Sequence, residues 1–342
     1  MIDIDEAISA SHTSIENGKA PVLSIRNLSV GPDSNSTAAI LDDISLDLYP
    51  NEIVGIVGET GAGKTILART LLNLLPSGLS ITSGDVRLGD RMITSLNEKQ
   101  LQSIRGKEIA FIGTNAKALL DPIRNIGTQI CRVLQSHQKI SDQEAWAAAI
   151  SFLHRIGIVD AERRVKAFPH ELSGGMAQRV VIAMALISQP SVLLADDATL
   201  GLDATVAIQV LDLIAERARR SNLSVIMIAH DINIIANYCD RIAIMRDGRI
   251  VELAKVTDFL SSQQSAYGKE LMEVATTKTL SEPSITHIDS GPIALVEVKN
   301  LVKTFAGKTP GSEVRAVDDV SFRSERAKRW LWSVKADQAR PQ

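Results

Sequence analysis

The sequence predicts an α/β protein with a mainly parallel core sheet, an antiparallel β subdomain at its start and an inserted helical subdomain. Three observations support this prediction. Short apolar segments with strand character alternate with segments of helical spacing between residues 52 and 245. A glycine-rich loop at 58–65 joins one of these strands to the next helix. The stretch from about 105 to 170 has mostly helical patterns.

The expected elements begin with two strands. Residues 22–30 alternate in polarity, and 40–48 follow after a turn-forming stretch, which indicates an antiparallel pair. An apolar strand at 52–57 comes next, and a helix at 65–75 stops before Pro76. Later elements are helices at 180–187 and 202–220, strands at 191–195, 224–229 and 241–245, and a helix that starts at the capping box of Ser141 and Glu144.

Beyond these elements the chain changes character and then repeats itself. Residues 1–20 are polar and predicted to be a disordered lead-in, and 276–292 are rich in Thr, Ser and Pro and predicted to be a linker. After the linker, Ile25-Arg26-Asn27-Leu28 returns as Val298-Lys299-Asn300-Leu301. We therefore expect one domain at 21–275 and the start of a second copy at 293–327.

Composition excludes several classes of protein. A net charge of −3 gives no electrostatic reason to expect a nucleic-acid partner. Cys131 and Cys239 are far apart and lack a CxxC spacing, so neither a disulfide framework nor a zinc site is predicted. No segment approaches the roughly 18 apolar residues of a membrane span. A membrane role is therefore expected to depend on docking to another protein.

The glycine-rich loop matches the P-loop pattern GxxxxGK[ST] without a gap. Its glycines allow the backbone N–H groups to face phosphates at the positive end of the following helix. In this pattern Lys64 neutralises β/γ-phosphate charge and the hydroxyl of Thr65 ligates Mg²⁺. The predicted binding residues are Gly58, Glu59, Thr60, Gly61, Ala62, Gly63, Lys64 and Thr65.

Two further motifs extend the nucleotide site. An apolar strand ends at Asp196, a carboxylate in place to hold Mg²⁺ through water in a P-loop protein. The segment LSGG at 172–175, followed by Arg179, opens a helix, so Ser173, Gly174 and Gly175 can bind a γ-phosphate there. The order P-loop, LSGGxxxR, apolar strand with Asp resembles ATP-binding cassette (ABC) ATPases over residues 23 to about 270.

Details of the motifs indicate which group of ABC ATPases the sequence resembles. FPHELSGG at 168–175 and Leu120-Asp121-Pro122 are similar to segments of the oligopeptide, dipeptide and nickel importers. Resemblance implies that His230 is the switch histidine at the γ-phosphate. It also implies membrane permease subunits, a second cassette as a homodimer or paralogue, and indirectly a periplasmic solute-binding protein. The expected location is cytoplasmic, peripheral on the inner face of the membrane.

Several positions depart from the family pattern. The family glutamine that assists Mg²⁺ and water falls on Thr114, and the catalytic glutamate falls on Asp197. No aromatic residue near 30–40 is available to stack on adenine, where Pro32 lies. Thr114, Asp197 and His230 are thus the candidate catalytic positions, and both Thr114 and Asp197 are shorter than the family residues. A carboxylate displaced by about 1 Å can slow a reaction on the order of a hundredfold.

The last residues do not continue the repeat. Residues 328–342 read KRWLWSVKADQARPQ, whereas with permissible codons and a one-base shift the same DNA can encode ETLALVGESGSGKTT, a second P-loop. We hypothesise an out-of-frame tail on a truncated two-cassette ATPase, with a natural basic tail as the alternative. The coding DNA tests this hypothesis.

The sequence predicts the ATP-binding subunit of an ABC importer for peptides or similar small solutes, with impaired hydrolysis. ATP and Mg²⁺ are the expected cofactors. Three alternatives stay open: a non-hydrolysing remnant of a frameshifted gene without a transport role, an enzyme that is simply slower, and an ABC ATPase outside transport.

Overall fold

The computed structural model describes residues 20–33, 39–280, 294–306 and 313–325. The chain divides into two compact units, 1–279 and 280–342, which are considered separately. The predicted lead-in up to residue 19, the linker from 281 and the tail 328–342 lie outside the described residues.

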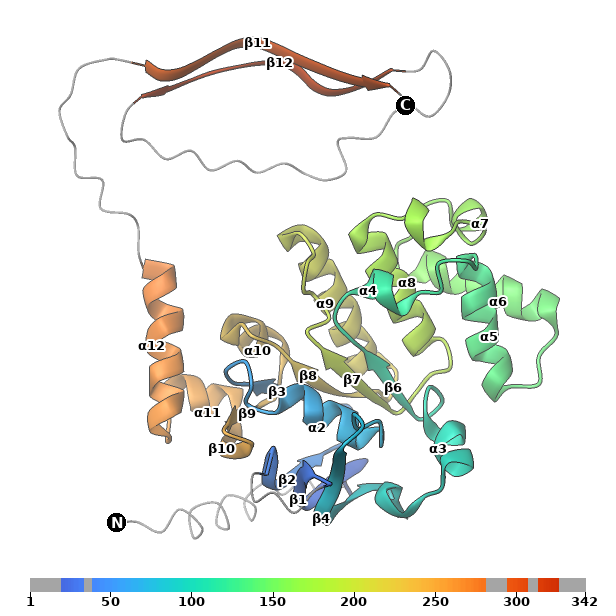
Figure 1. Cartoon of the computed structure of the whole chain (residues 1–342), viewed down its shortest axis with the longest axis vertical. Helices are drawn as coiled ribbons and strands as arrows, with labels where there is room; N and C mark the ends of the chain where they lie inside the picture. Colours follow the sequence, from blue (N-terminus) through green and yellow to red (C-terminus); the bar gives the residue numbers. More distant parts are fainter. Residues whose placement is uncertain (1–19, 34–38, 281–293, 307–312, 326–342) are drawn as a thin grey trace. The chain divides into compact units, whose positions relative to one another are not determined.

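The first unit begins with an antiparallel sheet whose strand order is β2-β1-β4-β5 (Figure 1). The alternating pattern of the first strand buries Ile25, Leu28 and Val30 completely. A register shift near Asn27, which has φ +45°, kinks this strand. The strand bounds are β1 (Leu23–Pro32), β2 (Leu41–Leu48), β4 (Leu79–Leu88) and β5 (Arg91–Met92).

The second sheet is the core sheet, with the strand order β10-β9-β3-β8-β7-β6. All of its pairings are parallel except that of β10 with β9. Every residue of β3, β7 and β8 is buried, as expected for parallel strands covered on both faces. The strand bounds are β3 (Ile53–Val57), β6 (Ile109–Ile112), β7 (Val192–Asp196), β8 (Ser224–Ile228), β9 (Arg241–Arg246) and β10 (Arg249–Lys255).

Helices surround the core sheet, and α4 to α8 gather into a group of their own (Figure 1). The capping box of Ser141 and Glu144 is confirmed at the start of α6. The helix bounds are α2 (Lys64–Leu71), α3 (Glu98–Ile104), α4 (Ala116–Leu119), α5 (Ile126–His137), α6 (Asp142–Arg155), α7 (Ala161–Arg164), α8 (Gly174–Leu186), α9 (Ala204–Arg220), α10 (Ile232–Tyr238), α11 (Val256–Ser261) and α12 (Ala266–Leu280).

The fold differs from the sequence expectations at several boundaries. The predicted helical segment 105–170 begins with β6, which pairs with β7 in the core sheet, so its helices start only at α4. The helix expected at 180–187 begins at Gly174, and α12 continues to Leu280, inside the predicted linker 276–292. Strands β4 and β5 and helices α3, α10 and α11 were not predicted, because short apolar patterns do not distinguish strand from helix. The 15-residue helix α12 was not predicted either.

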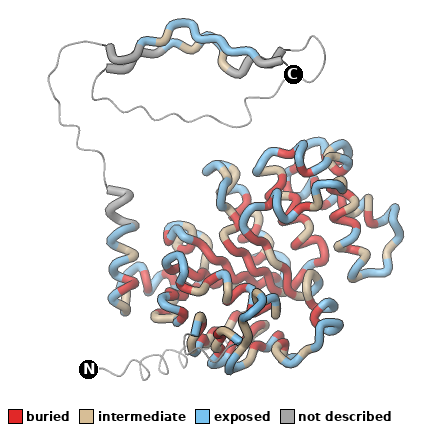
Figure 2. The backbone as a smooth tube through the Cα atoms, viewed as in Figure 1, coloured by how far each residue is buried: buried red, intermediate tan, exposed pale blue. Residues whose placement is uncertain are grey.

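The interior contains two apolar clusters. Figure 2 shows the buried residues in red, along the strands of the core sheet and parts of the helices. One cluster joins the helices of 116–187 to one side of the core sheet, and the other joins the antiparallel sheet and α2 to the opposite side. The core sheet is therefore packed on both faces, and the loops that follow its strands emerge at its edge.

The second unit contains β11 (Ala294–Ala306) paired with β12 (Glu313–Glu325). This pair repeats the local structure of β1 and β2: the Asn300 side chain donates to Asp319 at 2.6 Å, as Asn27 does to Asp43 at 2.8 Å. Leu301 is 46% exposed, whereas its counterpart Leu28 is fully buried. The hydrogen bond of the first strand pair therefore recurs in the second. The burial of the leucine does not: no apolar residues among those described bury Leu301 as they bury Leu28.

Candidate functional site

Four neighbouring parallel strands bring the predicted site segments to one edge of the core sheet. The loop 58–65 follows β3, His230 follows β8, Asp196 ends β7, and Thr114 follows β6. Parallel strands have their carboxyl ends at the same edge, which is where open α/β sheets bind ligands. The sheet order thus gathers residues that are more than a hundred positions apart in the sequence.

The glycines of the loop are required by its geometry. A Cβ at Gly58 would lie 2.1 Å from the carbonyl oxygen of Met245 in β9, so no side chain fits there. Gly61 and Gly63 have φ of +93° and +97°, values that residues with a Cβ rarely adopt. Glu59, Thr60 and Gly61 are exposed, so this part of the loop is open to a ligand.

Lys64 folds back onto its own loop. Its Nζ donates hydrogen bonds to the carbonyl oxygens of Gly58 and Glu59, at 2.7 and 2.8 Å. Burial lowers the pKa of Lys64, while the charges of Asp197 and Asp196 act in the opposite direction. The ammonium group is therefore held over the loop, where an anionic ligand would compete with the two carbonyls.

Asp196 and Thr65 offer hard oxygen atoms that fit a magnesium ion. Asp196 is 3% exposed, and among the described residues its Oδ1 is buried without a hydrogen-bond partner. Such an oxygen is costly to bury unless a cation or water reaches it. Thr65 is exposed on the first turn of α2. No described group of three or more acidic, His or Cys residues forms a complete cage, so Mg²⁺ would also need phosphate and water oxygens, as it commonly does.

Asp197 and His230 form a pair at the centre of this edge. Asp197 Oδ2 lies 2.8 Å from His230 Nε2. Asp197 has φ +47°, a left-handed conformation that Asp tolerates better than most residues. The Asp197 side chain is 13% exposed and the His230 side chain 50% exposed. The imidazole is thus accessible, while the carboxylate is largely enclosed.

Burial is the main influence on the Asp197 carboxyl group. It raises the pKa of Asp197, and the nearby charge of Asp196 adds to the rise. His230 and Lys64 oppose this change but do not cancel it. A carboxyl group with a raised pKa beside an imidazole is suited to accepting a proton.

The other predicted residues have no described hydrogen bond to the Asp197–His230 pair. Thr114 is exposed just beyond β6, at the same edge, and no described hydrogen bond joins it to Asp197 or His230. Ser173 is the N-cap of α8, where its Oγ accepts a hydrogen bond from the Met176 N–H at 3.3 Å. Ser173 and Gly174 are exposed, and Gly175 packs so closely that a Cβ would lie 2.7 Å from Val206. Among described residues, no hydrogen bond links 173–175 to the P-loop.

One contact of the loop was not anticipated from the sequence. The Glu59 N–H donates a hydrogen bond to the hydroxyl of Tyr267, 208 positions away, at 3.1 Å. No local pattern around Tyr267 indicates this contact, because it depends on the path of the chain after β10.

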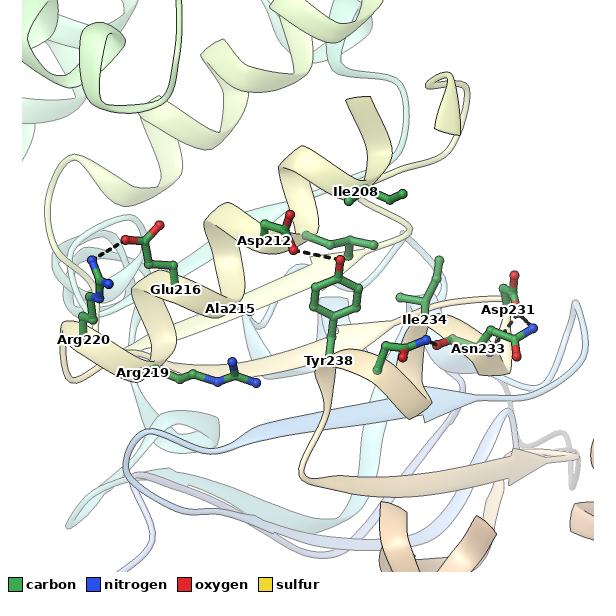
Figure 3. A pocket seen from close by; sticks show the side chains of 12 residues that line it. Ile208, Asp212, Ala215, Glu216, Arg219, Arg220, Asp231, Asn233, Ile234 and Tyr238 are labelled. Atoms are coloured by element: carbon green, nitrogen blue, oxygen red, sulfur yellow. Dashed lines mark hydrogen bonds and ion pairs between the residues drawn. The ribbon is translucent and has the colours of Figure 1, made fainter. Parts of the chain in front are cut away.

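A groove of about 840 Å³ lies between α9 and α10 (Figure 3). The Tyr238 hydroxyl donates to Asp212 at 2.9 Å across it. Its lining includes Asp231 but none of Lys64, Asp196 or Asp197. This groove is therefore separate from the P-loop edge.

Comparison with known proteins identifies relatives of this chain. Residues 41–200 match the family model described as "ABC transporter". The chain is 38% identical over 259 residues to the peptidoglycan transport ATP-binding protein YejF of Agrobacterium fabrum, covering 75% of this chain and 47% of that protein. It is 36% identical over 273 residues to the dipeptide transport ATP-binding protein DppD of Bacillus subtilis, covering 79% and 82%. The chain thus spans about half the length of YejF and most of DppD.

Solved structures show the same fold. The chain superposes on MJ0796, whose structure is described as a dimeric bacterial ABC transporter cassette, with a TM-score of 0.61 and 25% identity. The match covers 68% of this chain and 98% of that one. In the part of the chain that the structure describes, no helix is long and apolar enough to cross a membrane.

Proposed function

This chain belongs to the ABC transporter ATP-binding proteins, and we propose that it binds ATP with Mg²⁺ and hydrolyses it slowly. We further propose that it serves as the ATP-binding subunit of an importer for peptides or similar small solutes. The observation that carries the proposal is the Asp197–His230 pair at the edge where the P-loop and Asp196 also lie.

Phosphate binding is supported by the loop. The loop is exposed at Glu59, Thr60 and Gly61, and α2 begins at Lys64 with its positive end toward the loop. Lys64 would leave the carbonyl of Glu59 for a phosphate oxygen, which is the stronger acceptor because it is charged. Thr65 and Asp196 would hold Mg²⁺, which supplies positive charge at the transferring phosphoryl group.

Hydrolysis would depend on Asp197 and His230. Asp197, with its raised pKa, accepts the proton of the attacking water, and His230 contacts the γ-phosphate from its exposed side. Because the carboxylate of Asp197 ends one methylene short of a glutamate, the water would be held less closely. Thr114 lacks the length to orient it from the other side.

The proposed partners follow from family membership and from the exposed segment 173–175. Ser173 and Gly174 are exposed and have no described hydrogen bond to the P-loop of the same chain, which supports pairing with a second cassette. Membrane permease subunits at the inner face of the membrane, and indirectly a solute-binding protein, complete the proposed system. DppD is described as a dipeptide transport protein, which supports a peptide-like solute.

A second candidate function is nucleotide binding without turnover. It is favoured by one observation: Thr114 is exposed, and no described hydrogen bond joins it to Asp197 or His230, so it does not support this pair. In this case ATP would bind and the cassette would act only by pairing with a competent partner.

Lys64→Ala tests nucleotide binding. A ligand at about a hundred times its Kd stabilises a protein by about 2.7 kcal/mol, which corresponds to a rise in Tm of about 5 °C or more. We expect Mg²⁺-ATP to produce such a rise in the wild type and in the control Lys166→Ala, an exposed lysine between α7 and α8 that is not part of the loop. Lys64→Ala should lose it. Equal shifts in Lys64→Ala and the wild type would refute the proposed site.

A further inference from the structure

The start of α12 is fixed by a buried carboxylate. Glu252 of β10 is 6% exposed. Its Oε1 accepts a hydrogen bond from the Gln264 N–H at 2.8 Å, and its Oε2 accepts from the N–H and hydroxyl of Ser265, at 3.0 and 2.5 Å. The Ser265 hydroxyl in turn accepts from the Gly268 N–H at 2.8 Å. The N–H groups of Gln264, Ser265 and Gly268 therefore have defined partners, which set the direction in which the helix begins.

These hydrogen bonds leave no space for a side chain at position 268. A Cβ at Gly268 would lie 2.5 Å from Glu252 Oε2 and 2.8 Å from Ser265 Oγ. The residue between Ser265 and Gly268 that points into the protein is Tyr267, which is 4% exposed. The position of Tyr267 is thus determined by the contacts of its neighbours Ser265 and Gly268 with Glu252.

Tyr267 reaches the P-loop through its hydroxyl. The guanidinium of Arg246 lies over its ring, 4.7 Å from the centroid, and restricts the ring. The hydroxyl oxygen accepts the hydrogen bond from the Glu59 N–H at 3.1 Å. The carbonyl of Glu59 is the group that receives Lys64 Nζ at 2.8 Å. A single residue of the loop is therefore held by Tyr267 on its N–H side and by the phosphate-binding lysine on its carbonyl side.

We propose that Tyr267 is a positioning residue for the P-loop, which sets nucleotide affinity from α12. The inference rests on the proposed binding of ATP. A loop with two glycines at positive φ has many accessible conformations, and fixing it before the ligand arrives reduces the entropy lost on binding. Glu252 and Ser265 hold α12, α12 holds Tyr267, and Tyr267 holds the second residue of the loop.

Tyr267→Phe isolates this effect in the full chain. It keeps the packed ring and removes only the hydroxyl oxygen. Because Glu59 is an exposed residue, water can then bind its N–H group. The matched control is Tyr238→Phe, which removes the hydroxyl that donates to Asp212 in the groove between α9 and α10 (Figure 3). ATP affinity is measured by displacement of a fluorescent ATP analogue with Mg²⁺, and Tm is measured without nucleotide.

We expect Tyr267→Phe to weaken ATP binding about three- to tenfold, because the loop must then be ordered when the ligand binds. Its Tm without nucleotide should stay within about 2 °C of the wild type, and Tyr238→Phe should bind ATP within about twofold of the wild type. Unchanged affinity in Tyr267→Phe would overturn the inference, as would equal losses in the two variants. A wild type that fails to bind ATP would instead refute the proposed function.

Glu252→Gln tests the connection through α12. We expect it to weaken ATP binding in the same direction, and the double variant with Tyr267→Phe to be no weaker than the more affected single variant. Substitutions of residues that act through one another have non-additive effects on binding, whereas the effects of independent substitutions add. Additive losses would refute the proposed connection between Glu252 and the loop.

Discussion

Asp197→Glu tests whether the length of one side chain limits hydrolysis in this cassette. The substitution keeps the charge and adds one methylene, which moves the carboxylate toward the position of the attacking water. Asp197 Oδ2 now lies 2.8 Å from His230 Nε2, and the His230 side chain is 50% exposed, so the imidazole has room to move with the longer residue. The pair can therefore re-form in the variant.

The expected gain in kcat follows from how far the carboxylate moves toward the attacking water. A reacting group misplaced by about 1 Å loses on the order of a hundredfold in rate, which corresponds to about 2.7 kcal/mol of activation free energy. Thr114 would still leave the water incompletely held. We therefore expect Asp197→Glu to raise kcat about 10- to 100-fold, and to change the KM for ATP less than about threefold, because the P-loop is untouched.

The assay is steady-state release of phosphate from ATP by the full chain with Mg²⁺. Asp197→Asn is the control of equal size that cannot accept the proton, and its turnover should fall below that of the wild type. Adding Thr114→Gln to Asp197→Glu should raise kcat further.

Two results would contradict this reasoning. Wild-type turnover that already equals that of Asp197→Glu, with ATP binding intact in both, would mean that Asp197 is long enough. An Asp197→Asn variant as active as Asp197→Glu would mean that this carboxylate takes no part in the reaction.

Two further predictions concern stability. Because the pKa of Asp197 is raised above its ordinary value in the folded state, ionisation of Asp197 lowers the free energy of unfolding as pH rises through that pKa. The Tm of Asp197→Asn should therefore rise relative to that of the wild type as the pH rises above the ordinary pKa of an aspartate. A difference in Tm that stays constant with pH would contradict this. Gly58→Ala forces a Cβ to 2.1 Å from the Met245 carbonyl oxygen and should lower the free energy of unfolding in urea by about 2 kcal/mol or more. The control Gly174→Ala has no atom within 4 Å of the new methyl group and should leave the free energy of unfolding within about 0.5 kcal/mol.

Much of the fold could be predicted because its signals are local. The apolar run before Gly58 and the run that ends at Asp196 are strands covered on both faces, and their composition alone indicates this. The capping box of Ser141 and Glu144 is likewise a contact between near neighbours. Strand β6 was missed because four apolar residues inside a helix-rich stretch do not reveal their period.

The sequence by itself determined the P-loop, since GETGAGKT at 58–65 has the spacing and residue types that this backbone requires. Tertiary structure alone decided that Asp197 meets His230 and that Tyr267 meets Glu59. These contacts join residues that are 33 and 208 positions apart, and they exist because β7 and β8 are adjacent and because Glu252 fixes the start of α12. Local patterns are set by neighbouring residues, whereas such contacts depend on strand order and on the path of the chain between the strands.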